Sequence, residues 1–311
     1  MDKRIGIVES IWVGTPEMAR IIRQLDECRE RSRLASEPRC MFIEGESGVG
    51  KSLTIRHYLD RNPRRRETDA NGERTIIPVL SAMVPVPGSV GGLISELIRA
   101  TGDPLWNKRT SRLGDETARL RTLIENCSIE MIILDEIQHL APDGKESLRK
   151  SAADWVKNLI TQTGIPVVIV GVPYASRLID RHAQLRNRFS LRADLRPYDW
   201  KDRQSQKKLL KFLDLVDEEL PFSARSGLAE TETAMAIYQA SSGLPRLFMK
   251  LIRSAAIRAI RQDAAMVRPE DLAVVYEEEL NHFNGNFPNP FVTPPQLSRL
   301  VPSGDFAVDD E

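Results

Sequence analysis

The residues best suited to chemistry in this sequence form one continuous pattern, G-x-x-x-x-G-K-[ST], in the first fifth of the chain. The pattern is made up of Gly45, Glu46, Ser47, Gly48, Val49, Gly50, Lys51 and Ser52. Glycines let the backbone of such a loop wrap a phosphate, so that amide N–H groups and a helix N-terminus point at the anion. Lys51 would reach the β- and γ-phosphates, and the Ser52 hydroxyl would ligate Mg²⁺. The pattern therefore predicts that the chain binds a nucleoside triphosphate with Mg²⁺.

The segments on either side of the loop match what the motif requires. An apolar run at 40–43 precedes the loop and is typical of a strand, and residues 53–59 after it have a helical pattern. A strand, a glycine-rich loop and a helix, in this order, form the setting in which the motif binds phosphate. The alternative is a glycine-rich turn with an incidental lysine, and both flanks argue against it.

A second chemical pair, Asp135 and Glu136, follows the apolar run 131–134. At the carboxyl end of a buried strand, Asp135 would hold the Mg²⁺ shell. Glu136 would polarise the attacking water as a general base. The alternative is a strand that ends in solvated acids. The phosphate-binding loop upstream favours catalysis, and so does a strand expected at 75–80, which marks the NTPases with a catalytic glutamate beside the magnesium aspartate.

Apolar runs alternate with helical patterns over residues 1–200. Strands are expected at 40–44, 75–80, 130–134, 166–170 and 190–195. Helices are expected at 16–33, 51–60, 89–101, 114–127, 146–162 and 174–183. The continuous runs at 131–134 and 167–170 are typical of strands buried on both faces of a parallel sheet. The alternation predicts an α/β fold with a parallel five-stranded sheet flanked by helices. Residues 61–73 are expected to form a polar loop.

The strand pattern stops after Pro197. Helices are expected beyond it at 201–219, 229–241, 244–262 and 269–280. The last stretch is rich in Pro, Asn and Gly, which predicts an extended tail with a few hydrophobic anchors. We therefore expect three parts: a nucleotide-binding domain at 1–200, a small helical lid at 201–280, and a partly disordered, partner-binding tail at 281–311.

The bulk composition limits the class of protein. Lys+Arg and Asp+Glu number 44 each, so any surface that binds nucleic acid must be a local patch. The three cysteines form no C-x-x-C pair, which suits free thiols in a reducing compartment. No signal peptide is evident at the start, and the longest apolar run is too short to span a bilayer. These features predict a cytoplasmic protein without a membrane partner.

Further residues make the chain similar to the AAA+ ATPases. Arg186 and Arg188 precede the strand expected at 190–195, where AAA+ proteins carry the arginine finger that completes a neighbouring subunit's site. The resemblance implies ATP hydrolysis with Arg188 as the first choice for this finger and Arg186 as the second. The alternative is that either arginine only covers the domain surface. Arg246, in the run GLPR at 243–246, resembles the second sensor arginine, which touches the γ-phosphate in cis.

The position of the first sensor departs from the AAA+ pattern. The corresponding strand normally ends in Asn, Thr or Ser, but here Val170 is followed by Gly171, Val172 and Pro173. The missing polar side chain predicts ATP hydrolysis that is slow and regulated.

Within the AAA+ proteins, the chain resembles the TniB/TnsC transposition regulators, which are relatives of MuB. The resemblance rests on the runs at 12–16 (WVGTP), 170–173 (VGVP), 185–198 and 289–291 (NPF), and it extends over residues 8–295. Members form ATP-dependent rings or helical filaments on DNA. These assemblies mark a target for the transposase and are dismantled when hydrolysis is triggered. The implied partners are double-stranded DNA, further copies of the chain in a homo-oligomer, a transposase and a TniQ-like target-selection adaptor.

A neutral protein that binds DNA needs a local basic surface, because phosphate contacts dominate affinity. The first candidate lies after the second expected strand, where these relatives grip DNA, and comprises Lys108, Arg109 and Arg112. The second candidate follows the acidic pair and comprises Lys145, Arg149 and Lys150. A solvated charged loop is the alternative for both.

Two other functions compete with transposition. A replication initiator or loader of the AAA+ class would bind DNA through a recognisable domain after the lid. A nucleotide-gated signalling NTPase would act on protein partners without touching DNA. Dependence of DNA binding on ATP separates the first hypothesis from the signalling one.

Overall fold

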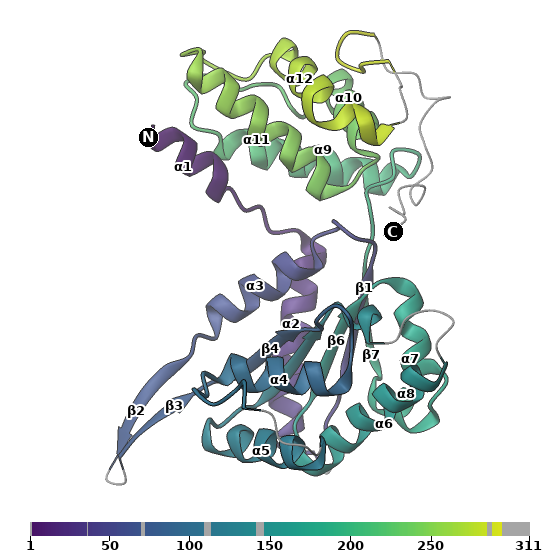
Figure 1. Ribbon diagram of the computed structural model, residues 1–311. Helices are drawn as coiled ribbons and strands as arrows, with labels where there is room; N and C mark the ends of the chain where they lie inside the picture. The colour runs from purple at the N-terminus through teal and green to yellow at the C-terminus, as the bar shows by residue number, and fades with distance from the viewer. Residues whose placement is uncertain are drawn as a thin grey trace. The chain divides into compact units, whose positions relative to one another are not determined.

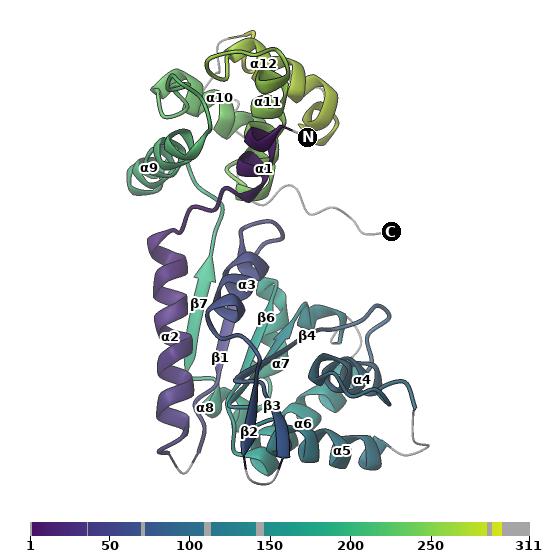
Figure 2. The same cartoon turned by 90° about the vertical axis from the view of Figure 1, so that its left-hand side faces the viewer.

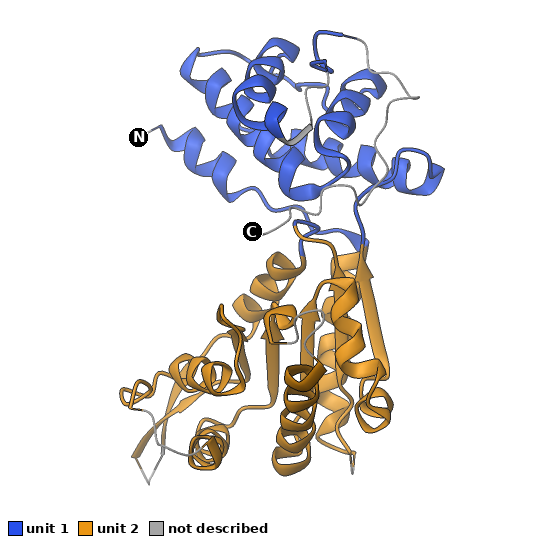
Figure 3. Cartoon of the chain, turned by 45° about the vertical axis from the view of Figure 1, so that its right-hand side comes forward, with its two compact units in different colours: residues 1–16, 48–50, 196–311 blue, residues 17–47, 51–195 orange. Residues whose placement is uncertain are grey.

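The computed structural model describes residues 2–35, 37–69, 72–108, 113–140, 146–284 and 288–293. The chain divides into two compact units, which Figure 3 shows in different colours. The sheet unit contains residues 17–47 and 51–195. The helical unit contains residues 1–16, 48–50 and 196–311.

The sheet unit is built on five parallel strands, as the sequence predicts. The strands are β1 (Met41–Gly45), β4 (Val79–Met83), β5 (Met131–Asp135), β6 (Val167–Gly171) and β7 (Leu191–Leu195). Their order in the sheet is β4-β5-β6-β1-β7, and neighbours pair in parallel register. Because the strands are parallel, the ends of β1, β6 and β5 lie at the same edge of the sheet, which is where such sheets bind ligands.

Side chains that alternate along the strands create an apolar layer on each face of the sheet. One layer contains Phe42 and Ile132, which pack with buried residues of α4 (Val90–Thr101), α5 (Leu113–Asn126) and α6 (Glu146–Thr163). Met41, Ile43 and Val168 occupy the alternate positions and are equally buried. Helix α2 (Pro16–Ser32) runs alongside β7 and β1 (Figure 2). Each large apolar side chain buried in this way stabilises the fold by about 1.5–3 kcal/mol.

Helix α3 (Lys51–Arg61) follows the phosphate-binding loop.

The prediction of a loop at 61–73 is wrong, because β2 (Arg65–Asp69) and β3 (Gly72–Ile76) form an antiparallel hairpin that extends from the sheet unit (Figure 1). The strand expected at 75–80 is accordingly two strands, the end of β3 and the start of β4. Charged pairs hold the hairpin: Glu67 contacts both Arg65 at 3.0 Å and Arg74 at 3.1 Å. The first pair lies along β2, whereas Glu67 and Arg74 are direct cross-strand partners. Such charged pairs replace the apolar alternation by which a strand is recognised in sequence.

The helix expected at 174–183 is also interrupted. A 3₁₀ turn (Pro173–Ser176) leads into α7 (Arg177–Asp180), and α8 (Ala183–Arg188) is a separate helix before β7. Another 3₁₀ turn (Ile137–His139) follows β5. Such turns are common as short connectors and at helix ends.

The helical unit contains α9 (Arg203–Glu219), α10 (Thr231–Ser241), α11 (Pro245–Arg261) and α12 (Pro269–Val275). A π-helical segment (Tyr276–Leu280) and a 3₁₀ turn (Asn281–Asn284) continue α12. Phe212 of α9 and Phe248 of α11 meet edge to face, with ring centroids 5.4 Å apart. The N-terminal helix α1 (Lys3–Ser10) belongs to this unit, and Arg253 of α11 donates to the carbonyl of Ile11 just after α1 at 2.8 Å. The domain boundaries drawn from the sequence stay a prediction.

The described part of the tail, residues 288–293, is anchored on the helical unit. The Asn289 side chain donates to the Ala273 carbonyl at 2.9 Å, and the Phe291 ring meets Tyr276 with centroids 6.4 Å apart. Pro290 is buried. The NPF run is therefore part of the packed structure.

The cysteines are free, as expected from their number. Burial raises the pKa of both Cys28 and Cys40 to about 12, so neither thiol ionises readily. Among the described helices, none is long and apolar enough to cross a membrane.

Gly243 is expected to be indispensable for the helical unit. Its φ is +73°, and a Cβ atom there would lie 2.1 Å from the Tyr198 carbonyl oxygen. Left-handed backbone costs about 1–2 kcal/mol with a side chain, and forced contacts typically cost about 1–3 kcal/mol. Gly243→Ala should therefore lower the free energy of unfolding by roughly 2–4 kcal/mol, measured by urea denaturation.

The matched control for this change is Gly6→Ala in α1, where an added Cβ meets nothing within 4 Å. This change should leave stability unchanged or raise it by up to about 1 kcal/mol, because alanine favours helix. Equal free energies of unfolding for Gly243→Ala and Gly6→Ala would contradict the requirement for glycine at position 243.

Candidate active site

The phosphate-binding loop joins the end of β1 to the start of α3. Gly48 and Gly50 have φ values of +87° and +104°, which glycine adopts without steric cost. Helix α3 begins at Lys51, so its N-terminus follows the loop directly. A loop of this form ending in a helix N-terminus suits an anionic phosphate group.

Lys51 is buried, and its ammonium group is held by the loop itself. Its Nζ donates to the carbonyl oxygens of Gly45 at 2.7 Å and Glu46 at 2.9 Å. Burial lowers the pKa of Lys51, and the carboxylates of Glu136 and Asp135 oppose that shift. The result is a cation pre-positioned at the loop, which is what binding of the β- and γ-phosphates requires.

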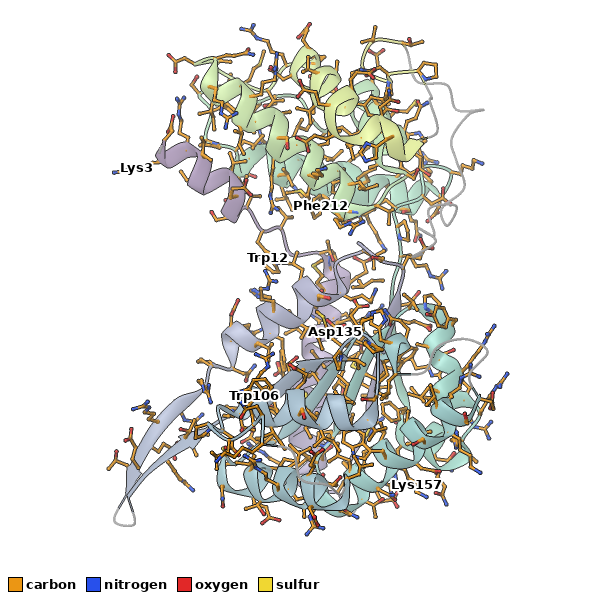
Figure 4. The ribbon with its side chains drawn as sticks, in the orientation of Figure 1. Lys3, Trp12, Trp106, Asp135, Lys157 and Phe212 are labelled. Carbon is orange, nitrogen blue, oxygen red and sulfur yellow. The ribbon has the colours of Figure 1, made fainter. Side chains whose placement is uncertain are left out.

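Ser52 and Asp135 come together, as the sequence predicts for two residues of one magnesium site. The Ser52 hydroxyl donates to Oδ2 of Asp135 at 2.8 Å. Asp135, which is labelled in Figure 4, is the last residue of β5. Both are oxygen ligands, which Mg²⁺ prefers. Within the described ranges, no cluster of three or more His, Cys, Asp or Glu side chains could hold a metal. A serine hydroxyl and a carboxylate fit Mg²⁺ completed by phosphate and water oxygens, as in nucleotide sites.

Glu136 stands at a sharp turn immediately after β5. Its backbone is left-handed, with φ 56° and ψ 41°, and its N–H donates to Oδ1 of Asp135 at 2.8 Å. Its carboxylate accepts a hydrogen bond from the Gln138 side chain and lies 3.8 Å from Nε2 of His139. Left-handed conformations of residues other than glycine concentrate at functional sites. The turn presents a carboxylate, the chemical group of a general base, beside Asp135.

Gln138 is the residue that sequence reasoning missed in this site. In the AAA+ pattern the polar sensor lies at the end of the strand that corresponds to β6, where this chain has Gly171 and Val172. The amide that reaches this strand end comes instead from the turn after β5, since Oε1 of Gln138 accepts from the Val172 N–H at 3.4 Å. The available signal was a polar side chain two positions after Glu136.

The two arginines before β7 have different surroundings. Arg188 is held within its own chain: its guanidinium donates to Oγ1 of Thr161 at 3.0 Å and lies 3.8 Å from Glu37. Arg186 is exposed, and its side chain has no ion pair or hydrogen bond to a described residue. Of the two arginines, Arg186 is the one whose side chain is exposed.

Arg246 lies at the start of α11, in the helical unit. Its backbone N–H donates to the carbonyl of Gly48 at 3.0 Å, and Gly48 belongs to the same unit. A Cβ atom on Gly48 would lie 3.1 Å from Cβ of Arg246, so this contact also favours glycine in the loop.

The candidate DNA contacts are only partly described. Lys108 and Lys150 are exposed. Arg109, Arg112 and Lys145 lie outside the described residues. Arg149 is buried and pairs with Glu146 at 2.9 Å. Lys108 and Lys150 are thus the candidate lysines with accessible side chains among the described residues.

The sheet order, the glycine-rich loop and the acidic pair together define an AAA+ P-loop ATPase. A family model described as "Bacterial TniB protein" matches residues 4–199, and the chain belongs to this family. None of the curated proteins matches this sequence.

Solved structures of similar fold include proteins that are distant in sequence. Orc1 of Aeropyrum pernix in complex with DNA is 18% identical with a TM-score of 0.61, covering 89% of this chain and 71% of that one. Cdc6p of Pyrobaculum aerophilum is 16% identical with a TM-score of 0.62, covering 90% and 71%. Orc2 of Aeropyrum pernix, in ADPNP and ADP complexes, is 15% identical with a TM-score of 0.59, covering 88% and 70%. These likenesses establish the shared fold.

Removing the Ser52 hydroxyl should uncouple nucleotide binding from Mg²⁺. Ser52→Ala deletes the group that bonds Asp135, so we expect ATP affinity in Mg²⁺ to fall about 10-fold or more, in line with the loss of a hydrogen bond to a charged group. Titration calorimetry with a slowly hydrolysed ATP analogue, with Mg²⁺ and with EDTA, measures the effect.

Wild-type protein in EDTA is the control. With Mg²⁺ and with EDTA alike, the Ser52→Ala protein should bind the ATP analogue with the affinity of this control. A variant that retains the full wild-type gain from Mg²⁺ would contradict the assignment of Ser52 as a ligand.

Proposed function

We propose that this chain is a transposition regulator that binds double-stranded DNA as an ATP-loaded homo-oligomer, in a ring or filament, and directs a transposase to it. ATP hydrolysis, slow and regulated, then drives disassembly. The observation that carries the proposal is the complete constellation of Lys51, Ser52, Asp135 and Glu136 in a member of the TniB family. The fold that the chain shares with Orc1 and Cdc6p does not by itself favour the replication alternative.

The chemistry assigned to the site follows from the positions of its groups. Lys51 would hold the β- and γ-phosphates, and Ser52 and Asp135 would hold Mg²⁺, which would supply positive charge against the developing negative charge. Glu136 takes the proton of the attacking water. Arg246 would contact the γ-phosphate in cis, the role that its resemblance to the second sensor arginine implies. Hydrolysis thus leaves on the loop a diphosphate, which carries less negative charge than the triphosphate.

The arginine finger is assigned to Arg186. The exposure and lack of a partner among described residues support this choice, whereas the Arg188 guanidinium is occupied by Thr161. Arg188 then holds α8 against α6, and Arg186 reaches the ATP of the neighbouring copy. This assignment makes each site shared between two subunits, which couples ATP loading to assembly.

The DNA surface is assigned to the basic segment that includes Lys108, Arg109 and Arg112, with Lys150 as a secondary contact. The exposure of Lys108 and Lys150 supports it, and the ion pair of Arg149 with Glu146 argues for a structural role of that arginine. A TniQ-like adaptor and the transposase are the protein partners that the family membership suggests.

Glu136→Gln should trap the protein on DNA. Without a general base, ATP turnover should fall about 10²–10⁴-fold, while ATP and DNA stay bound. Lys51→Ala should bind neither ATP nor, in consequence, DNA. Electron microscopy and fluorescence anisotropy with duplex DNA, with and without ATP over a salt series, measure assembly and affinity.

Glu232→Gln, an exposed glutamate on α10, is the matched control and should behave as wild type. Wild-type affinity should fall linearly with the logarithm of salt concentration. DNA affinity that is equal with and without ATP would contradict the proposal, and no DNA binding at all would favour the signalling alternative.

A mixing experiment tests the finger. Arg186→Ala should lower DNA-stimulated ATP turnover about 10³-fold or more without lowering ATP affinity. Adding Glu136→Gln protein, which is inactive but carries an intact Arg186, should restore turnover at the shared sites. Arg188→Ala, the matched control, should lower thermal stability but keep most of the turnover.

Restoration by mixing is the decisive readout. Turnover that stays lost in the mixture would contradict a finger supplied in trans by Arg186, and a selective loss with Arg188→Ala would return the role to Arg188.

A further inference from the structure

Gln138, a buried glutamine in the turn after β5, uses both ends of its side-chain amide. Its Nε2 donates to Oε2 of Glu136, and its Oε1 accepts from the Val172 N–H at 3.4 Å. The residue is 9% exposed. Because Val172 directly follows β6, this one side chain links the carboxylate of Glu136 to the end of the neighbouring strand.

The chemistry of the two partners fixes the side chain that is needed between them. A carboxylate only accepts hydrogen bonds, and a backbone N–H only donates them. An amide satisfies both in a single orientation, with its nitrogen toward Glu136 and its oxygen toward Val172. A glutamate at position 138 would have the same shape but would lose the donor.

The packing at the end of β6 leaves room for this amide. A Cβ atom on Gly171 would lie 2.8 Å from Cγ2 of Ile137 and 3.0 Å from Oε1 of Gln138. The strand therefore ends without a side chain at the place where the sequence pattern lacks a polar sensor. The polar group at this place comes from the β5 turn instead.

We propose that Gln138 is a positioning residue that holds the Glu136 carboxylate at the end of β6 for the activation of water. This inference rests on the proposed function in that Glu136 is taken as the general base of ATP hydrolysis. In the sheet, β6 lies between β5 and β1, the strand that leads into the phosphate-binding loop. A carboxylate held toward β6 is thus held on the side of β5 where the loop begins.

The role predicts a separation of turnover from binding. Gln138→Ala and Gln138→Glu should each lower kcat for ATP about 10-fold, the order expected for loss of a hydrogen bond to a charged group. KM for ATP should stay within about twofold, because Gln138 acts through Glu136 and the loop holds the nucleotide. Gln162→Ala is the matched control: this exposed glutamine of α6 accepts from Arg121 and should change neither constant.

Two further variants separate positioning from folding. In single-turnover reactions of a Glu136→Gln background, Gln138→Ala should cause no additional loss, because residues that act as a unit are not additive. Gly171→Ala, whose Cβ would displace the amide, should reproduce the loss of kcat. If Gly171→Ala does not fold, the two Gln138 variants and the double variant decide the question.

The outcomes are distinguishable. If the wild-type chain hydrolyses ATP and both Gln138 variants keep its kcat, the positioning role alone is overturned. The same holds if the loss of rate from Gln138→Ala adds fully to the loss from Glu136→Gln in the double variant. A wild-type chain that does not hydrolyse ATP, with and without DNA, would overturn the proposed function and this inference with it.

Discussion

The hydrogen bond from the Ser52 hydroxyl to the Asp135 carboxylate, 2.8 Å long, is the contact on which the rest of the site depends. It joins the start of α3 to the end of β5, two segments that are far apart in the chain. The bond can form only because β1, β6 and β5 run parallel, so that their carboxyl ends share one edge of the sheet. The apolar layers on both faces fix this arrangement. The polar side chains of the site are thus positioned by buried apolar side chains that do not belong to it.

The elements that the sequence predicts well are those where pattern and burial agree. The strands around Ile43, Ile133 and Val168 are continuous apolar runs because both faces of the sheet are covered, and such runs are visible without a structure. The phosphate-binding loop and the acidic pair were predictable for another reason. In P-loop ATPases the spacing of such residues is set by contact with a phosphate and a metal, which leaves few residue types free to vary.

The parts that could not be predicted depend on contacts between polar side chains. The β2–β3 hairpin is held by Glu67 and its arginines, whose pattern in sequence is that of a solvated loop. The segment 185–198 does not reveal that Arg188 has a partner, because Thr161 is contributed by another helix. Nor does it reveal that Arg186 is exposed. Gln138 was missed because its role depends on an N–H group of β6. Such pairings are set by tertiary geometry alone.

The hairpin also bears on how the chain avoids unwanted strand pairing with other molecules. A two-stranded sheet separate from the main sheet leaves unpaired N–H and C=O groups along its outer edges, which invite strand addition from another molecule. In this chain those edges carry arginine and glutamate side chains that are mostly exposed. Charged side chains hinder indiscriminate β-pairing, and an isolated hairpin of this kind is only marginally stable. The charged edges therefore oppose strand addition between copies of this chain.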